Sequence, residues 1–174
     1  MMTMLLAVGM LAIVPRSESR LPQSKKATGQ VALEGSFDLD TSADRALLFF
    51  TPEGERAWVK EWNPKPVYPP QAGVAFQTNA VFRVDQGGER SLWTILGANS
   101  EEYTAEYVYV VQGERLSRVR VKIEPLDAKH CRVRIRYVHT ATSEKGLQFV
   151  ASATEEVFAQ KMRDWHRMVS AAIR

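Results

Sequence analysis

Residues 115–141 read RLSRVRVKIEPLDAKHCRVRIRYVHTA and carry the clearest structural signal in the chain. Two runs in this stretch, 115–124 and 131–141, alternate apolar residues with arginine or lysine. Because successive side chains of a strand point to opposite faces of a sheet, each run predicts a strand with one buried and one exposed face. The turn residues at 126–129 predict that the two strands form an antiparallel hairpin.

The same alternation extends towards the N-terminus. Short turn signals such as Gly87-Gly88 separate the runs, and short connections of this kind join antiparallel neighbours. Further strands are predicted at 30–39, 73–77, 80–85, 90–98 and 103–111.

Helices are predicted at two places. Two short helices, 42–50 and 52–60, follow the first strand, because Thr51-Pro52 restarts the chain with a capping residue and a proline suited to a first helical position. Apolar residues then step by three or four over 144–173, which predicts one long amphipathic helix. The order of elements predicts an α+β fold: a curved seven-stranded antiparallel sheet wrapped around the long C-terminal helix, with a cavity between them.

The charge of the chain is concentrated in one stripe. The net charge is +3, whereas residues 112–136 hold eight Lys or Arg and three Asp or Glu, a local balance of +5. We interpret this stripe as the solvated face of the sheet, with Glu106 and Glu124 pairing into it. The alternative is a surface for nucleic acid or anionic lipid. No aromatic residue is predicted among the outward-facing basic ones, so we expect no nucleic-acid partner.

The N-terminal residues form a separate segment. Residues 1–29 are predicted to be an apolar leader and linker outside a domain spanning 30–174. The uncharged run 1–14 is too short for a transmembrane helix, so no transmembrane span is predicted. Its length suits a secretory signal, with 17–19 as the candidate cleavage site, but no basic residue precedes it. We expect a cytoplasmic protein, with export to the periplasm or beyond as the alternative.

Several motifs resemble those of the START-like (SRPBCC) helix-grip superfamily, and most closely its polyketide cyclase/dehydrase-type members. The resemblance spans about 30–174 and implies the helix-grip fold. Members of this superfamily include carriers of hydrophobic ligands and aromatic cyclases. The motifs are FTPEGERAW at 50–58, WNP at 62–64, Tyr68-Pro69, Val81-Phe82 before Trp93-Thr94, YVHTA at 137–141 leading into 144–146, and the last helix with Thr154-Glu155-Glu156 and Trp165.

The inward face of the sheet and the last helix supply the candidate site. The alternation of side chains along the strands points four residues inward: Tyr107, Tyr109, Tyr137 and His139. Tyrosines in this position can orient a ligand or can pack in the core. Two tryptophans, four residues apart, form either a lid over the cavity or a packing contact. The predicted ligand-binding residues are Trp58, Trp62, Phe82, Trp93, Tyr107, Tyr109, Tyr137, His139, Thr154, Phe158 and Met162.

The sequence contains few residues in patterns typical of catalytic or metal-binding sites. The three histidines and single cysteine lack metal-ligand spacing, so neither a metal nor a cofactor is predicted, and Cys131 is interpreted as buried filler. His139 and Tyr137 are the candidate catalytic residues, although His139 has no orienting carboxylate in the sequence. The sequence makes no prediction of oligomeric state.

Three functions follow in order of preference. The first is non-catalytic binding of a hydrophobic small molecule, which could be a lipid, an aromatic compound or a polyketide-like compound. The second is an enzyme of the cyclase, aromatase or dehydrase type acting in the same cavity. The third is an interaction module that uses the basic sheet face.

Overall fold

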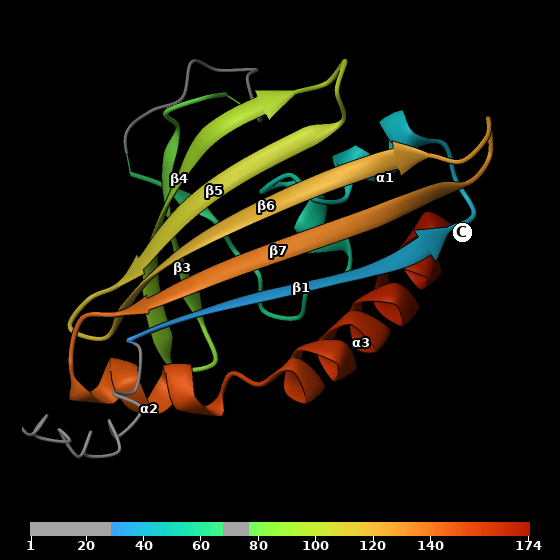
Figure 1. Cartoon of the computed structure of the whole chain (residues 1–174). Helices are drawn as coiled ribbons and strands as arrows, with labels where there is room; N and C mark the ends of the chain where they lie inside the picture. The colour runs from blue at the N-terminus through green and yellow to red at the C-terminus, as the bar shows by residue number, and fades with distance from the viewer. Residues whose placement is uncertain (1–28, 68–76) are drawn as a thin grey trace, which may run out of the picture.

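The computed structural model describes residues 29–67 and 77–174 (Figure 1). Within these residues, seven strands form one antiparallel sheet in the order β1-β7-β6-β5-β4-β3-β2. The strands are β1 (Gln30–Leu39), β2 (Lys65–Pro66), β3 (Val81–Gln86), β4 (Glu89–Asn99), β5 (Thr104–Val111), β6 (Arg115–Pro125) and β7 (Cys131–Ala141). The helices are α1 (Ala43–Leu48), the 3-10 helix η1 (Gly54–Ala57), α2 (Glu144–Ser152) and α3 (Glu155–Ile173).

The strands confirm the alternation seen in the sequence. In β6 and β7, buried and more exposed residues alternate, and Ile123, Cys131 and Val133 are fully buried. Gly87 and Gly88 both have positive φ angles, of 58° and 81°, and form the turn between β3 and β4. The predicted seven-stranded antiparallel sheet is therefore confirmed.

Two predicted elements differ from the observed ones. The predicted strand 73–77 lies outside the described residues except for its last residue, which belongs to no strand, and the second strand is instead the short β2, paired with β3. The second short helix, predicted over 52–60, is only the four-residue η1. Its helical turn starts two residues after Pro52 and ends before Trp58.

The C-terminal segment forms two helices where one was predicted over 144–173. Ala153 leaves the helical conformation with a ψ of 78°, and Thr154 begins α3 by accepting a hydrogen bond from the backbone N–H of Val157 at 3.2 Å. Threonine followed by two glutamates is a helix N-terminal signal. The apolar spacing continues across this break, which is why periodicity alone did not reveal it. The long helix of the fold is α3.

Helix α3 runs along β1 and closes one side of the curved sheet (Figure 1). The close approach depends on Gly35 in β1, where an added Cβ would lie 2.6 Å from the Cγ of Met162. Phe158 and Met162 therefore bury their side chains against β1 at the edge of the sheet. Because the helix covers this edge, space is left between α3, η1 and the inner face of the middle strands.

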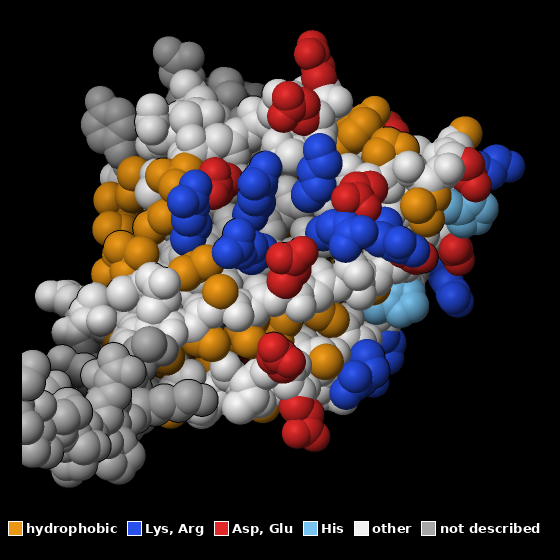
Figure 2. Space-filling view, in the orientation of Figure 1, with side chains coloured by type: hydrophobic (Ala, Val, Ile, Leu, Met, Phe, Trp, Pro, Cys, Tyr) orange, Lys and Arg blue, Asp and Glu red, His pale blue; other side chains and the backbone are white. Residues whose placement is uncertain are grey.

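The opposite face of the sheet carries the basic stripe (Figure 2). Arg118 pairs with Glu106, and Arg134 pairs with Glu124 at 2.9 Å, as predicted from the sequence. The Arg132 guanidinium also contacts Asp38 at 2.7 Å. These ion pairs neutralise part of the stripe, as the solvated-face interpretation expects. None of the described helices has both the length and the apolar character that a membrane span requires.

Candidate functional site

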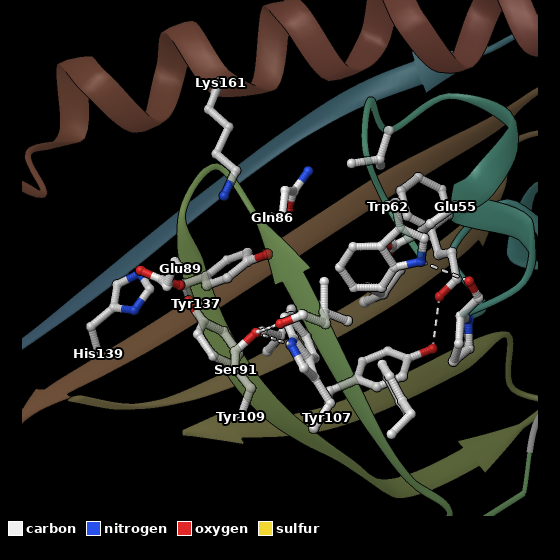
Figure 3. Close-up of a pocket in the computed structure, with 18 of the residues that line it drawn as sticks. Glu55, Trp62, Gln86, Glu89, Ser91, Tyr107, Tyr109, Tyr137, His139 and Lys161 are labelled. Carbon is white, nitrogen blue, oxygen red and sulfur yellow. Dashed lines mark hydrogen bonds between the residues drawn. The ribbon is translucent and has the colours of Figure 1, made fainter. Parts of the chain in front are cut away.

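A cavity of about 340 Å³ lies between the inner face of the sheet, the region of η1 and helix α3 (Figure 3). Its floor consists of inward side chains from β3 to β7, and its sides come from η1, α2 and α3. The lining combines aromatic rings with a set of ionisable groups.

Stacked aromatic rings form one wall. The Trp93 ring stacks on the rings of Tyr109 and Phe82, with ring centroids 4.2 Å and 5.9 Å apart. The Trp62 ring contacts Trp93 edge-on, with centroids 5.4 Å apart. The indole N–H groups are occupied within the protein, because Trp62 donates to the carbonyl of Pro52 and Trp93 to the hydroxyl of Ser91. The wall therefore offers ring faces and edges, which suit a flat apolar ligand.

Glu55 from η1 and Lys161 from α3 are an acid and an amine of the cavity lining whose pKa values burial shifts strongly. Burial raises the pKa of the Glu55 carboxyl to about 8, although the charge of Lys161 opposes this shift. Burial lowers the pKa of Lys161 to about 8, against the attraction of Glu55. Each group is therefore shifted towards its neutral form, because loss of solvation outweighs their mutual attraction.

The Lys161 side chain reaches from α3 towards the cavity (Figure 3). Its Nζ lies 4.5 Å from the ring centroid of Tyr137 and 4.7 Å from that of Trp165. Within the described part of the chain, it makes no hydrogen bond and no salt bridge within 4.0 Å. Its Nζ therefore contacts aromatic faces, which hold an ammonium less strongly than a carboxylate does.

A buried charge network lies at another part of the lining. Arg115 donates through Nη2 to both carboxylate oxygens of Glu89, at 2.7 and 2.8 Å, and through Nη1 to Glu114. Its guanidinium lies 3.8 Å from the ring centroid of Phe149. Lys145 contacts the second oxygen of Glu114 at 2.7 Å, and hydrogen bonding to Lys145 is the main cause that lowers the pKa of Glu114. The network balances two cations with two carboxylates.

His139 and Tyr107 each contact a hydrogen-bond partner within the protein. The Nδ1 of His139 lies 2.7 Å from the hydroxyl of Ser117, and burial with nearby Lys161 and Arg115 lowers its pKa to about 4. His139 is therefore neutral at pH 7. The Tyr107 hydroxyl donates to the carbonyl of Phe50 at 2.7 Å, and burial raises its pKa well above the usual value.

The cavity brings together seven of the residues predicted to bind a ligand. They are Trp62, Phe82, Trp93, Tyr107, Tyr109, Tyr137 and His139. Of these, the sequence also named Tyr137 and His139 as catalytic candidates. Their placement in the lining fits the predicted site.

Four other predicted residues do not line the cavity. Thr154 is the exposed cap of α3, and Phe158 and Met162 pack on Gly35 at the sheet edge. The Trp58 ring lies between Phe50 and Trp165, and its N–H donates to the carbonyl of Phe49, as expected for a packing contact. The sequence placed these residues on the cavity because it could not show how far α3 is offset from the middle of the sheet.

Sequence reasoning missed the charged residues of the lining. Arg115 has the same parity as Ser117 and Val119, so strand alternation alone could have turned it inward. Lys161 follows Phe158 by three positions and precedes Trp165 by four, which places it near the apolar side of α3. Nothing local distinguishes Glu55 from a surface glutamate, because only the tertiary fold places η1 against the cavity.

No group of three or more His, Cys, Asp or Glu side chains within residues 29–67 and 77–174 is arranged to hold a metal ion. Cys131 is fully buried, and burial raises the pKa of its thiol to about 11. A thiol of this kind stays protonated at neutral pH and is a poor nucleophile.

This protein is similar to known proteins in its structure but not detectably in its sequence. The sequence matches no family model and no curated protein. A point mutant of norcoclaurine synthase from Thalictrum flavum, in complex with a transition state analogue, has a TM-score of 0.59 at 8% identity over 82% of this chain and 92% of that chain. The di-domain ARO/CYC BexL from the BE-7585A biosynthetic pathway has a TM-score of 0.56 at 12% identity, over 80% of this chain and 46% of that one.

A third solved structure, Ara h 8.0201, has a TM-score of 0.56 at 11% identity and covers 83% of this chain and 98% of that chain. At these identities the similarity is one of fold. The chain has the helix-grip fold of the START-like (SRPBCC) superfamily, as its motifs implied.

Proposed function

We propose that this protein binds a small aromatic molecule bearing a carbonyl or hydroxyl group in the cavity between the sheet and α3. The observation that carries the proposal is an aromatic wall, formed by Trp62, Phe82, Trp93 and Tyr109, in a cavity that ionisable groups also line. Rings bury a flat apolar body, and a few polar groups fix its orientation.

The size of the cavity narrows the ligand class. A volume of about 340 Å³ is at the small end of ligand pockets, which suits one or two fused rings better than a long acyl chain. One structural neighbour supports a ligand of this kind. Norcoclaurine synthase from Thalictrum flavum has been solved in complex with dopamine and hydroxybenzaldehyde.

Thermal unfolding with a matched pair of compounds tests the proposal. We expect 2-naphthalenemethanol, at a hundredfold excess over its Kd, to raise the Tm by about 5 °C or more. Dodecanoate, a flexible acyl chain, should raise it much less. No rise with any of a panel of one- and two-ring aromatic alcohols would contradict the proposal.

Two variants of neighbouring β4 residues locate the binding site. Trp93→Ala removes a ring of the cavity wall and should weaken binding by roughly tenfold or more, because a stacked aromatic contact is lost. Leu92→Ala is the control, because Leu92 is 48% exposed on the other face of the same strand. Its ligand-induced change in Tm should equal that of the wild type, each measured against the unliganded variant.

A second function, ring closure in a polyketide-like substrate, is favoured by Glu55 and Lys161. Both groups line the cavity with pKa values of about 8, where an acid and a base can exchange protons with substrate at neutral pH. His139 is less suited to this role, since a base with a pKa of about 4 is weak.

Ring closure of a linear aryl triketone, followed by the absorbance of the aromatic product, tests this second function. We expect Glu55→Gln to slow the reaction by about a hundredfold, as for loss of a general acid or base, and His139→Ala to slow it much less. Equal rates with and without the wild-type protein would exclude catalysis of this reaction.

A further inference from the structure

Lys161 has the surroundings of a reactive amine. Lysines such as Lys60 and Lys145 lie in solvent, with side chains that are 90% and 76% exposed. Lys161 instead extends from α3 into the aromatic cavity, with its Nζ near the rings of Tyr137 and Trp165. A lysine placed in this way loses its proton more readily than a solvated one and becomes a nucleophile.

Glu55 supplies the second group that such an amine needs. It lies on the η1 side of the cavity, apart from the α3 side from which Lys161 enters (Figure 3). The two side chains are close enough to influence each other's ionisation but form no salt bridge within 4.0 Å. A small ligand placed between them could contact both the amine and the acid.

We propose that Lys161 forms an imine with the carbonyl carbon of an aromatic aldehyde or ketone bound in the cavity, and that Glu55 supplies the proton for loss of water. This inference rests on the proposed function, since it assigns the reactive group of the ligand that the cavity binds. The imine restricts the ligand class, because only an aromatic compound with an unhindered carbonyl group can react with Lys161.

The reaction balances with the groups present. The neutral amine of Lys161 forms a C–N bond to the carbonyl carbon, and an N–H proton is transferred to the oxygen to give a carbinolamine. The C–O bond then breaks, and the hydroxyl leaves as water with the proton of the Glu55 carboxyl. The products are a protonated imine, one water molecule and the Glu55 carboxylate. No oxidant or reductant is consumed, and the carboxylate faces the new cation.

Several charges set the fraction of neutral amine. The carboxylates of Glu55 and Glu89 favour the ammonium, whereas Arg115 disfavours it, and burial outweighs all of them. With a pKa of about 8, the neutral fraction of Lys161 at pH 7 is about two orders of magnitude above that of a lysine with the ordinary value of 10.5. His139, which also interacts with Lys161, is uncharged at this pH.

Reductive trapping tests the proposal on the full chain. The protein is incubated at pH 7 with 2-naphthaldehyde and sodium cyanoborohydride, which reduces an imine to a stable amine, and the product is mapped by peptide mass spectrometry. We expect one naphthylmethyl group per chain at Lys161, and labelling of Lys60 and Lys145 at least tenfold slower. Lys161→Met should abolish the fast labelling, whereas Lys60→Met should leave it unchanged.

Glu55→Gln separates the role of the acid from that of the amine. A glutamine side chain at this position cannot supply a proton, so labelling of Lys161 at pH 7 should slow by at least tenfold. A circular dichroism spectrum and Tm for each variant establish that it folds. Unchanged labelling in Glu55→Gln would overturn the assignment of Glu55 as the proton donor.

The outcomes distinguish this inference from the proposed function. If 2-naphthalenemethanol binds but Lys161 is labelled no faster than Lys60, the cavity binds aromatic ligands and the imine is overturned. If neither the alcohol nor the aldehyde binds, both the imine and the proposed function are overturned. Fast labelling that 2-naphthalenemethanol inhibits by competition supports both.

Discussion

Replacing Arg115 with methionine is expected to reduce the free energy of unfolding by about 1 to 3 kcal/mol. The Arg115 side chain is only 4% exposed and contacts two carboxylates, Glu89 and Glu114. Methionine fills a similar volume, but it leaves the 6%-exposed Glu114 with Lys145 as its remaining cation. Because Glu114 keeps one of its two cations, the expected cost is that of the charge-assisted hydrogen bonds lost at Glu89 and Glu114, which is smaller than the cost of an unpaired buried charge.

Arg118→Met provides the matched control for this prediction. Arg118 lies on the same strand, three residues further on, and also pairs with a glutamate, but its side chain is 58% exposed. An exposed ion pair contributes about 0 to 1 kcal/mol, so this variant should unfold close to the wild-type denaturant midpoint. Equal loss of stability in the two variants would contradict a special role for the Arg115 network.

The strands were predictable because their signal is local. Alternation in 131–141 specifies which residues face inward, and the observed register pairs Val119 with Tyr137 as two inward residues. The turn at Gly87-Gly88 was equally local, because positive φ angles at two successive positions favour glycine. For these elements, the sequence pattern and the tertiary structure agree, and the sheet could be predicted in full apart from β2.

The charged lining was not predictable in the same way. A glutamate in a polar segment such as 52–57 indicates a surface position, and only packing of η1 over the sheet places Glu55 in the cavity. The offset of α3 towards β1 depends on the contact of Met162 with Gly35, between residues more than a hundred positions apart. The sequence therefore predicted the aromatic part of the site and missed Glu55 and Lys161, on which the proposed ring closure and imine formation depend.

Glu55 and Lys161 each lower the stability of the folded protein at pH values where the group is charged in the unfolded chain. Glu55 and Lys161 each lose solvation without forming a salt bridge, so the folded state disfavours both charged forms. Binding sites often hold such groups, because a ligand can supply the partner that the protein does not. Replacing one of them with a neutral side chain should then stabilise the unliganded protein, at a pH where the group is ionised in the unfolded chain.

Glu55→Gln is expected to stabilise the protein in a pH-dependent manner. The pKa of Glu55 rises from 4.5 to about 8 on folding, so between these values the folded state retains a proton that the unfolded state has lost. Below pH 4.5, Glu55 is protonated in both the folded and the unfolded state, so its raised pKa costs no stability. As the pH rises from 4.5 towards 8, only the unfolded state loses this proton, and the folded protein becomes progressively less stable. Glutamine does not titrate, so the variant should match the wild type near pH 4.5 and exceed it by roughly 3 to 5 kcal/mol near pH 8 to 9.

Denaturant unfolding of both proteins from pH 4.5 to pH 9 measures this difference. Comparing the two curves removes the opposite contribution of His139, whose pKa falls from 6.5 to about 4 on folding and whose stabilising effect is therefore lost as the pH drops. Glu53→Gln is the control, because the Glu53 side chain is 56% exposed and pairs only with Arg56 at the surface. It should follow the wild-type pH dependence within about 1 kcal/mol. A difference for Glu55→Gln that does not grow with pH would show that the folded protein ionises Glu55 as readily as the unfolded chain does, and would remove the acid on which both ring closure and imine formation depend.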